Sequence, residues 1–311
     1  MAKVFNVDSS FDYGMLAGAS CAFGVFDGVH KGHCFLINQA KQTAAENGGI
    51  SVALTFDIDP DERFHADRLK KLMTNERRIA ALSQTGVDAV VVLPFTPEFS
   101  AQSPEGFLKT TFADSVPYAL HVGCDFHFGA RAAGGVGDLR AWADKRGAKI
   151  CAHDLKSADG KPITATRIRL LLAEGKCEEA LALLGHPYSF EGTVTKGRGE
   201  GTDMGFSTAN IELSGMMQTL GEGVYAAWVT VDGVRYKAAM SMGVAPTFAD
   251  ATATCEVHIL DFSGEIYGDV IEVEPVHFLR PMMKFDSLDA LIATVMDNIS
   301  WVRENLREEA C

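Results

Sequence analysis

The sequence predicts an α/β domain with a parallel sheet, followed by a mainly antiparallel β domain that ends in a helix. Three observations lead to this prediction. At 311 residues the chain is long for a single core. In its first 185 residues, runs that are apolar throughout alternate with helical patterns, as in a parallel sheet covered on both faces. After His186-Pro187, period-two alternation and Gly-rich turns indicate a compact barrel or sandwich, so we expect the domains to be 1–185 and 186–311.

The first domain is expected to hold buried parallel strands with helices between them. The candidate strands are Cys21–Phe26, Ile50–Phe56, Ala89–Leu93, Ala119–Gly123 and Lys149–His153. The candidate helices include Cys34–Glu46, Asn75–Gln84 and Leu139–Lys145. Parallel sheets bind their ligands at the carboxyl ends of the strands, so the turns after these strands are the expected places for a site.

The next elements are a helical segment and a set of short strands. Ile163–Gly185 has apolar residues at helical spacing, with a break expected at Gly175. Period-two alternation and Gly-rich turns mark the candidate strands Val224–Val231, Glu256–Leu260 and Val270–Val276. The final helix, Ser287–Glu308, is expected to have an apolar face made of Leu288, Leu291, Val295 and Ile299.

The composition is that of a globular protein, with 47% hydrophobic and 22% charged residues. A net charge of -13 opposes general binding to nucleic acid or anionic lipid, although a small basic pocket could bind a phosphorylated small molecule. The seven cysteines are scattered and contain no C-x-x-C pair, which favours reduced thiols over disulfides or a zinc site. No signal-peptide pattern and no apolar stretch near the roughly 20 residues of a membrane span is visible. We therefore expect a cytoplasmic protein without a membrane or nucleic-acid partner, and its oligomeric state stays open.

The stretch CAFGVFDGVHKGH, residues 21–33, joins a predicted strand to a predicted helix through a Gly-rich turn. Glycines let the backbone approach a polyphosphate closely, and the amides at a helix N-terminus point toward an anion. His30 and His33 lie in this turn, and imidazoles can donate hydrogen bonds to phosphate oxygens during an in-line transfer. The alternative is a tight turn whose histidines face solvent.

A second Gly-rich stretch, GRGEGTDMGFSTANI at residues 197–211, raises the same question in the second domain. It is not a Walker A loop, because no Gly-Lys-Ser/Thr follows. In an extended segment Thr208 and Asn210 point the same way, and their oxygens could bind Mg²⁺. A flexible hairpin is the alternative.

Glu256 lies in a predicted strand, where it shares a face with His258 and is opposite to Cys255 and Val257. Considered alone, it is a carboxylate on the solvated side of a β domain. His258 and His277 are expected to be packing or surface residues.

Several segments together resemble the bacterial bifunctional riboflavin kinase/FMN adenylyltransferase (FAD synthetase) family. GVFDGVHKGH (24–33) resembles the nucleotidyltransferase signature of that family, and GFSTAN (205–210) resembles its riboflavin kinase signature, Gly-Phe-Pro-Thr-Ala-Asn. The other matching segments follow in the family's order: LTFDIDP (54–60), VGCDFHFG (122–129), ITATRIRLLLAEG (163–175), SMGVAPTF (241–248), CEVHILDF (255–262), IYGD (266–269) and FLRPMMKFDS (278–287).

The resemblance implies a Rossmann-like nucleotidyltransferase domain at 1–185 and a β-barrel riboflavin kinase domain with a C-terminal helix at 186–311. It implies that the chain phosphorylates riboflavin to FMN with MgATP, then transfers AMP from a second ATP to FMN, forming FAD and pyrophosphate. ATP, riboflavin and FMN would be its small-molecule substrates and Mg²⁺ its metal.

The resemblance also implies roles for individual residues. Glu256 would take the proton from the riboflavin 5′-hydroxyl, His30 and His33 would act on the ATP phosphates, and Thr208 and Asn210 would hold Mg²⁺. The implied ATP- or phosphate-binding residues are Gly24, Phe26, Gly28, Gly32, Thr166, Arg167, Gly199, Gly201, Gly205 and Thr208. The implied flavin-binding residues are Asp125 and Arg280.

This sequence departs from the family pattern at several positions. Asp59 stands where the family usually has His, and it is expected in a solvated loop or, with Asp57, as a metal-binding pair. The other departures are Ala165 for Ser, Thr202 for Arg and Ser207 for Pro. The alternatives are therefore an enzyme that retains one activity, a flavin- or nucleotide-binding regulator without turnover, and a cytidylyltransferase-like enzyme with an unrelated partner domain.

Overall fold

A computed structural model describes the chain except for residues 67, 197–205, 245–252 and 308–311. The chain forms two compact units. The first contains residues 1–69 and 73–165, and the second contains residues 70–72 and 166–311. Each unit is a set of residues that contact one another more than they contact the other unit. The boundary between functional domains, expected at 185/186, stays a prediction.

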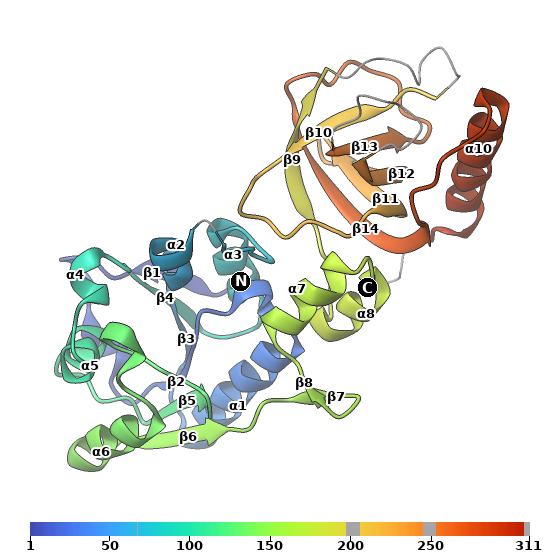
Figure 1. Cartoon of the computed structure of the whole chain (residues 1–311). Coiled ribbons are helices and arrows are strands. Elements are labelled where there is room, and N and C mark those ends of the chain that lie inside the picture. The colour runs from blue at the N-terminus through green and yellow to red at the C-terminus, as the bar shows by residue number, and fades with distance from the viewer. Residues whose placement is uncertain (67, 197–205, 245–252, 308–311) are drawn as a thin grey trace. The chain divides into compact units, whose positions relative to one another are not determined.

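The first unit is built on a six-stranded parallel sheet with the order β1-β4-β3-β2-β5-β6 (Figure 1). The strands are β1 Lys3–Asn6, β2 Ser20–Phe23, β3 Ser51–Phe56, β4 Ala89–Leu93, β5 Ala119–Gly123 and β6 Lys149–His153. The expected strands are confirmed, except that β2 ends at Phe23 and the expected residues 24–26 belong to the turn that follows; β1 is an addition. β2 and β3 are buried along their whole length, which explains why their sequences are apolar or small without alternation.

Helices cover both faces of this sheet. They are α1 Lys31–Asn47, α2 Pro60–His65, α3 Asn75–Gln84, α4 Pro97–Ser100, α5 Pro104–Phe112 and α6 Val136–Arg146. Side chains of α1 and α3 pack in the core on one face, and those of α5 and α6 pack on the other (Figure 1). The start of α3 is set by Thr74, whose hydroxyl accepts a hydrogen bond from the Arg77 amide.

The second unit begins with α7 Ala165–Ala173 and α8 Cys177–Leu184, and Gly175 lies between them at φ 76°. This left-handed conformation suits glycine and confirms the expected break. A closed antiparallel barrel follows, with the order β10-β13-β12-β11-β14-β9 (Figure 1). Its strands are β9 Phe190–Thr195, β10 Ala209–Leu213, β11 Gly223–Val231, β12 Val234–Val244, β13 Ala253–Ile259 and β14 Val270–Arg280.

The last helix, α10 Leu288–Asn305, packs on the outside of the barrel. Ser287 caps it, because its hydroxyl accepts a hydrogen bond from the Ala290 amide. The expected apolar face is partly wrong: Leu288 is 57% exposed, and the buried stripe lies further along the helix. Leu288 is in the first turn, before the helix reaches the core cluster. The stripe contains Ile292, Val295, Ile299, Val302 and the following Leu306.

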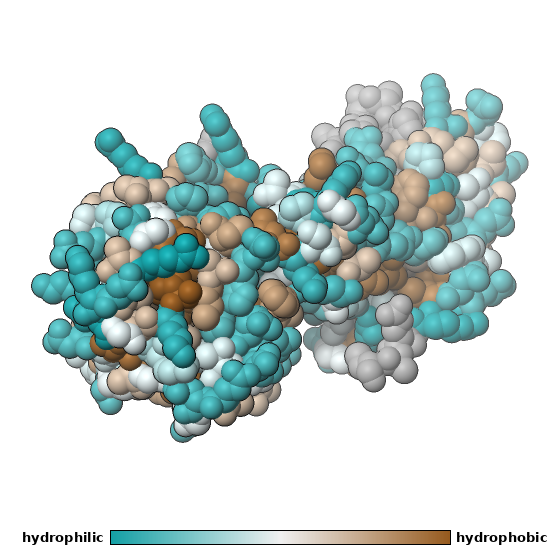
Figure 2. Space-filling model, turned by 90° about the horizontal axis from the view of Figure 1, so that it is seen from below, coloured by the Kyte–Doolittle hydropathy of each residue, from teal (hydrophilic) through white to brown (hydrophobic). Residues whose placement is uncertain are grey.

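The surface shows mixed polarity. Figure 2 shows hydrophilic residues over most of the visible face of each unit, with smaller groups of hydrophobic residues between them. Within the part of the chain that the structure describes, no helix is both long and apolar enough to cross a membrane.

Candidate functional site

The turn after β2 has an unusual backbone. Phe26 and Val29 have φ of 63° and 38°, and Gly28 has φ of 75°. Residues other than glycine rarely adopt positive φ, and residues with such a strained backbone cluster at functional sites. The turn ends where α1 begins, so the amides of the first turn of α1 lie beside it.

The two histidines of this turn are held against each other. The His30 and His33 rings stack with centroids 3.5 Å apart at 16°, and His30 is only 4% exposed. His30 Nδ1 accepts a hydrogen bond from the His33 amide at 3.3 Å, so the proton of a neutral His30 ring is on Nε2. His30 is therefore the N-cap residue of α1, the helix that contains His33 in its first turn.

Burial, His30 and Arg78 together hold the pKa of His33 well below its ordinary value of 6.5. His33 is consequently neutral at pH 7. Its Nδ1 is buried and has no hydrogen-bond partner among the described residues. A neutral imidazole with an N–H can donate to an anionic oxygen without adding a formal charge.

The glycines of this turn are needed for close packing. A Cβ on Gly32 would lie 3.1 Å from the His30 ring and 3.3 Å from the Ile163 carbonyl oxygen. A Cβ on Gly24 would lie 3.1 Å from the Phe26 ring. These glycines allow the rings of the turn to pack closely, and phosphate contacts at Gly24, Phe26, Gly28 and Gly32 stay predictions.

Sequence reasoning missed Arg78, which fastens this turn to the neighbouring strand. Its side chain lies in the core, 1% exposed. It donates to the carbonyl oxygens of Val25 at 2.9 Å and Phe56 at 2.8 Å, and to Thr55 Oγ1 at 2.6 Å. Burial lowers its pKa, and nearby carboxylates oppose that shift. Arg78 is one of two adjacent arginines in NERRIAAL (75–82), and in sequence it resembles any cation on a helix surface, so only its packing identifies it.

Asp59 does not lie in a solvated loop as expected. It is 8% exposed and caps α2, accepting from the Asp61 amide at 2.9 Å. Burial raises its pKa. Asp57 Oδ1 accepts from the Ile58 and Phe95 amides, each at 2.8 Å. The two carboxylates thus organise the chain after β3, and among the described residues no cluster of three or more His, Cys, Asp or Glu could hold a metal.

Three other predicted residues have simple placements. Asp125 is exposed in the turn after β5, at the carboxyl edge of the sheet. Thr166 is exposed and Arg167 half-buried in the first turn of α7, at the start of the second compact unit. The roles of all three at the flavin or the phosphates stay predictions.

A second histidine pair, also missed by sequence reasoning, lies in the same sheet. His121 on β5 is 2% exposed, and its Nδ1 is 2.9 Å from His153 Nε2 on β6. One of these nitrogens donates and the other accepts, so the accepting ring must be neutral and the pair cannot carry a proton on all four ring nitrogens. Burial, with His153 nearby, lowers the pKa of His121 from 6.5 to about 4.

Acid is expected to destabilise the protein through this pair. The unfolded chain binds a proton at His121 near pH 6.5, whereas the folded chain resists it until about pH 4. Protonation of His121 therefore does not reduce the free energy of unfolding above pH 6.5, and it reduces that free energy progressively as the pH falls toward 4. Between pH 7.5 and 5.0 this amounts to about 2 kcal/mol. Urea unfolding of the wild type and His121→Leu over this range measures it: the variant should lose less stability on acidification, and equal losses would contradict the prediction.

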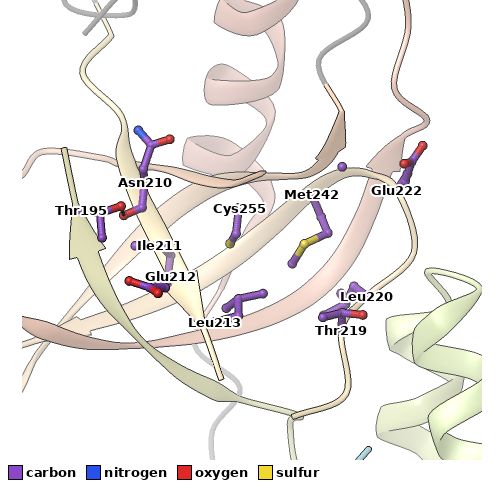
Figure 3. Close-up of a pocket in the computed structure, with 11 residues that line it drawn as sticks. Thr195, Asn210, Ile211, Glu212, Leu213, Thr219, Leu220, Glu222, Met242 and Cys255 are labelled. Carbon is purple, nitrogen blue, oxygen red and sulfur yellow. Dashed lines mark hydrogen bonds between the residues drawn. The ribbon is translucent and has the colours of Figure 1, made fainter. Parts of the chain in front are cut away.

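The barrel contains a cavity of about 460 Å³. Figure 3 shows Ile211, Leu213, Met242 and Cys255 around its centre, with Asn210 and Glu222 at its edges. The apolar lining follows from strand alternation, which directs Ile211 and Cys255 to the interior. The remaining lining residues are Thr195, Glu212, Thr219, Leu220 and Gly243.

Asn210 and Glu256 lie directly opposite each other in the antiparallel pair of β10 and β13. Opposed residues share a face, with Cβ atoms about 4.5–5.5 Å apart. Glu256 and His258 are half-buried and alternate with the buried Cys255 and Val257, as expected. The barrel therefore places an amide and a carboxylate side by side in its wall, at the edge of the cavity.

Thr208 is half-buried and immediately precedes β10. The Thr208 hydroxyl and the Asn210 amide oxygen, beside the Glu256 carboxylate, are hard oxygen donors of the kind that Mg²⁺ prefers. This donor set fits Mg²⁺. The predicted phosphate-binding residues Gly199, Gly201 and Gly205, and the departure at Thr202, lie outside the described residues.

Arg280 is half-buried at the end of β14, and its Nη1 donates to the Pro281 carbonyl oxygen at 3.1 Å. Its guanidinium lies over the Phe285 ring at 5.6 Å, and burial lowers its pKa. Nε is buried and has no hydrogen-bond partner among the described residues. The flavin-binding role of Arg280 stays a prediction.

The two remaining histidines of the barrel have defined partners. His277 pairs with Glu178 of α8 and stacks on Trp301 of α10, with ring centroids 4.7 Å apart. His258 Nδ1 lies 2.8 Å from the Ser207 carbonyl oxygen. His277 is thus a packing residue, as expected, whereas His258 is tied to the segment that carries Thr208.

Two family models match successive parts of the chain: FAD synthetase at residues 14–167 and riboflavin kinase at residues 184–306. A bifunctional riboflavin kinase/FMN adenylyltransferase of Listeria monocytogenes is 39% identical over 280 residues, covering 88% of this chain and 87% of the relative. A bifunctional riboflavin kinase/FMN adenylyltransferase of Haemophilus influenzae is 34% identical, and the match covers 89% of this chain and 91% of that relative. A crystal structure from Streptococcus pneumoniae, described as a macrolide-efflux protein, has a TM-score of 0.81 at 28% identity and covers 97% of this chain and 99% of its own.

Proposed function

The chain belongs to the family of bifunctional riboflavin kinases/FMN adenylyltransferases, and from this premise we propose which of its residues carry each reaction. As a member it phosphorylates riboflavin to FMN and adenylylates FMN to FAD, with ATP as the donor in both steps. The kinase reaction is assigned to the Asn210–Glu256 face of the barrel. The adenylyl transfer is assigned to the His30–His33 turn after β2.

The pairing of Asn210 with Glu256 carries the kinase assignment. The riboflavin 5′-hydroxyl is a weak nucleophile, and a positioned carboxylate accelerates its attack by accepting the proton. The oxygen of the riboflavin 5′-hydroxyl forms a bond to the γ-phosphorus of ATP, while the bond from that phosphorus to the bridging oxygen of ADP breaks. Glu256 receives the proton of the hydroxyl. Thr208 and Asn210 would hold Mg²⁺, which neutralises phosphate charge when it is bound.

In adenylyl transfer the FMN phosphate is itself the nucleophile. One of its oxygens forms a bond to the α-phosphorus of ATP, and the bond to the pyrophosphate oxygen breaks. No protein base is needed, so positioning and charge stabilisation are the main requirements. The Nε2–H of His30, a donor from neutral His33 and the N-terminal amides of α1 are suited to bind the phosphate oxygens. The phosphate-binding roles of Thr166 and Arg167 stay predictions from the family resemblance.

A cytoplasmic location stays a prediction, supported by the free thiols of Cys21, Cys34, Cys124, Cys151, Cys177 and Cys255. The Mg²⁺ requirement is supported by the oxygen donors beside Glu256.

A chromatographic assay of riboflavin plus MgATP, run beside FMN plus MgATP, tests the assignment of two active sites. FMN and FAD in the first reaction and FAD in the second are expected, and EDTA should suppress FMN formation. FMN without FAD in both reactions would show that the His30–His33 site is inactive. FAD formed only from supplied FMN would show that the kinase site is inactive. Flavin binding without ATP consumption would contradict both assignments.

A further inference from the structure

The segment that carries Thr208 lies between two anchors. On one side, Ala209 begins the paired part of β10, opposite Val257. On the other side, Phe206 is 8% exposed and packs in the cluster between the barrel and α10. Only Ser207 and Thr208 separate these anchors, so the direction of the Thr208 side chain depends on how the backbone crosses this gap.

His258 reaches into this gap. It lies one position beyond Val257 on β13, past the last residue of that strand that is paired with β10. Its Nδ1 is 2.8 Å from the Ser207 carbonyl oxygen, and its ring meets the Phe206 ring edge-on at 6.4 Å. A carbonyl oxygen only accepts hydrogen bonds, so Nδ1 carries the proton. The imidazole thus bonds to the segment that lies just before the paired part of β10.

We propose that His258 is a positioning residue of the kinase site: its Nδ1–H holds the Ser207 carbonyl and thereby orients Thr208 beside Asn210 and Glu256. This rests on the proposed assignment of the kinase reaction to that face. His258 is on the same face of β13 as Glu256, so one strand supplies both the carboxylate and the bond that fixes the neighbouring segment. Position 207 is serine, which does not restrict φ as proline does, so a side-chain hydrogen bond is an effective constraint here.

The test compares two nearly isosteric variants of the full chain. His258→Leu removes the donor, whereas His258→Asn retains an amide N–H attached to Cγ, as Nδ1 is in histidine. In the ligand-free protein, amides 206–209 of the Leu variant should exchange with deuterium about tenfold faster than in the wild type. Its KM for MgATP in riboflavin phosphorylation should rise about five- to tenfold, with a smaller change in kcat. The Asn variant should restore both values to within about twofold.

Two results would overturn the proposal. If the exchange rate and the KM for MgATP of His258→Leu equalled those of the wild type, the hydrogen bond would not fix the segment. If the Leu and Asn variants had equal defects, ring packing against Phe206 would be the important property instead. If His258→Leu does not fold, as judged by circular dichroism, His258→Ser replaces it, because a serine side chain is too short to reach the carbonyl. The exchange measurement needs no substrate, so it distinguishes failure of this proposal from failure of the kinase assignment.

Discussion

Glu256→Gln is expected to lower the rate of FMN formation by about 10²- to 10⁴-fold, the usual contribution of a positioned base. The change keeps the size of the side chain but removes its ability to accept a proton from the riboflavin hydroxyl. Conversion of supplied FMN to FAD should stay within about twofold of the wild type, because that reaction is assigned to the other unit and needs no base. Initial rates from separate riboflavin and FMN assays measure both effects.

A matched control is Glu265→Gln, an equivalent change at an exposed glutamate between β13 and β14. It should leave both rates unchanged. If Glu256→Gln abolished both activities in a folded protein, the separation of the two reactions would be wrong. If it left FMN formation intact, Glu256 would not be the base, and its place opposite Asn210 would need another explanation.

His33→Ala is expected to have the opposite pattern, lowering FAD formation from FMN by about 10²- to 10³-fold while FMN formation continues. The neutral imidazole at the start of α1 is lost, and with it the hydrogen-bond donor that we propose for the phosphates during transfer. His33 also stacks on His30, so the His30 ring loses its neighbour. The rate of FAD formation at saturating FMN and MgATP measures the loss.

His33→Asn separates donation from packing in this site. It retains a side-chain N–H and should lose less activity than His33→Ala, while His65→Ala, at an exposed position of α2, should behave as the wild type. Equal losses in the Ala and Asn variants would point to ring stacking as the important property. Wild-type FAD formation in His33→Ala would remove His33 from the proposed mechanism.

Local sequence predicts the strands of the parallel sheet well because burial makes them distinctive. β4, β5 and β6 have the bounds expected from their apolar runs, and α3 has the bounds expected from its helical pattern. The first turn of α10 shows the limit of this reasoning. Leu288 has the right spacing for the apolar face, but it is exposed because no core surface lies beneath it.

The residues of the candidate sites also differ in whether the sequence alone could identify them. His30 and His33 are three residues apart, so one turn of backbone brings their rings together, and the sequence alone is enough to propose them as a pair. Arg78 and the His121–His153 pair had no such signal. Their partners come from other strands, and burial decides what these side chains do.

By itself the sequence predicted two successive domains, the two Gly-rich segments and residue types that are suited to binding phosphate, since these depend on local periodicity and on short spacings. Only the tertiary structure placed Glu256 opposite Asn210 and His258 beside Ser207. Both placements depend on the register between β10 and β13, strands far apart in the chain. A shift of one residue would turn the carboxylate to the other face, and that register is set by packing of the whole barrel.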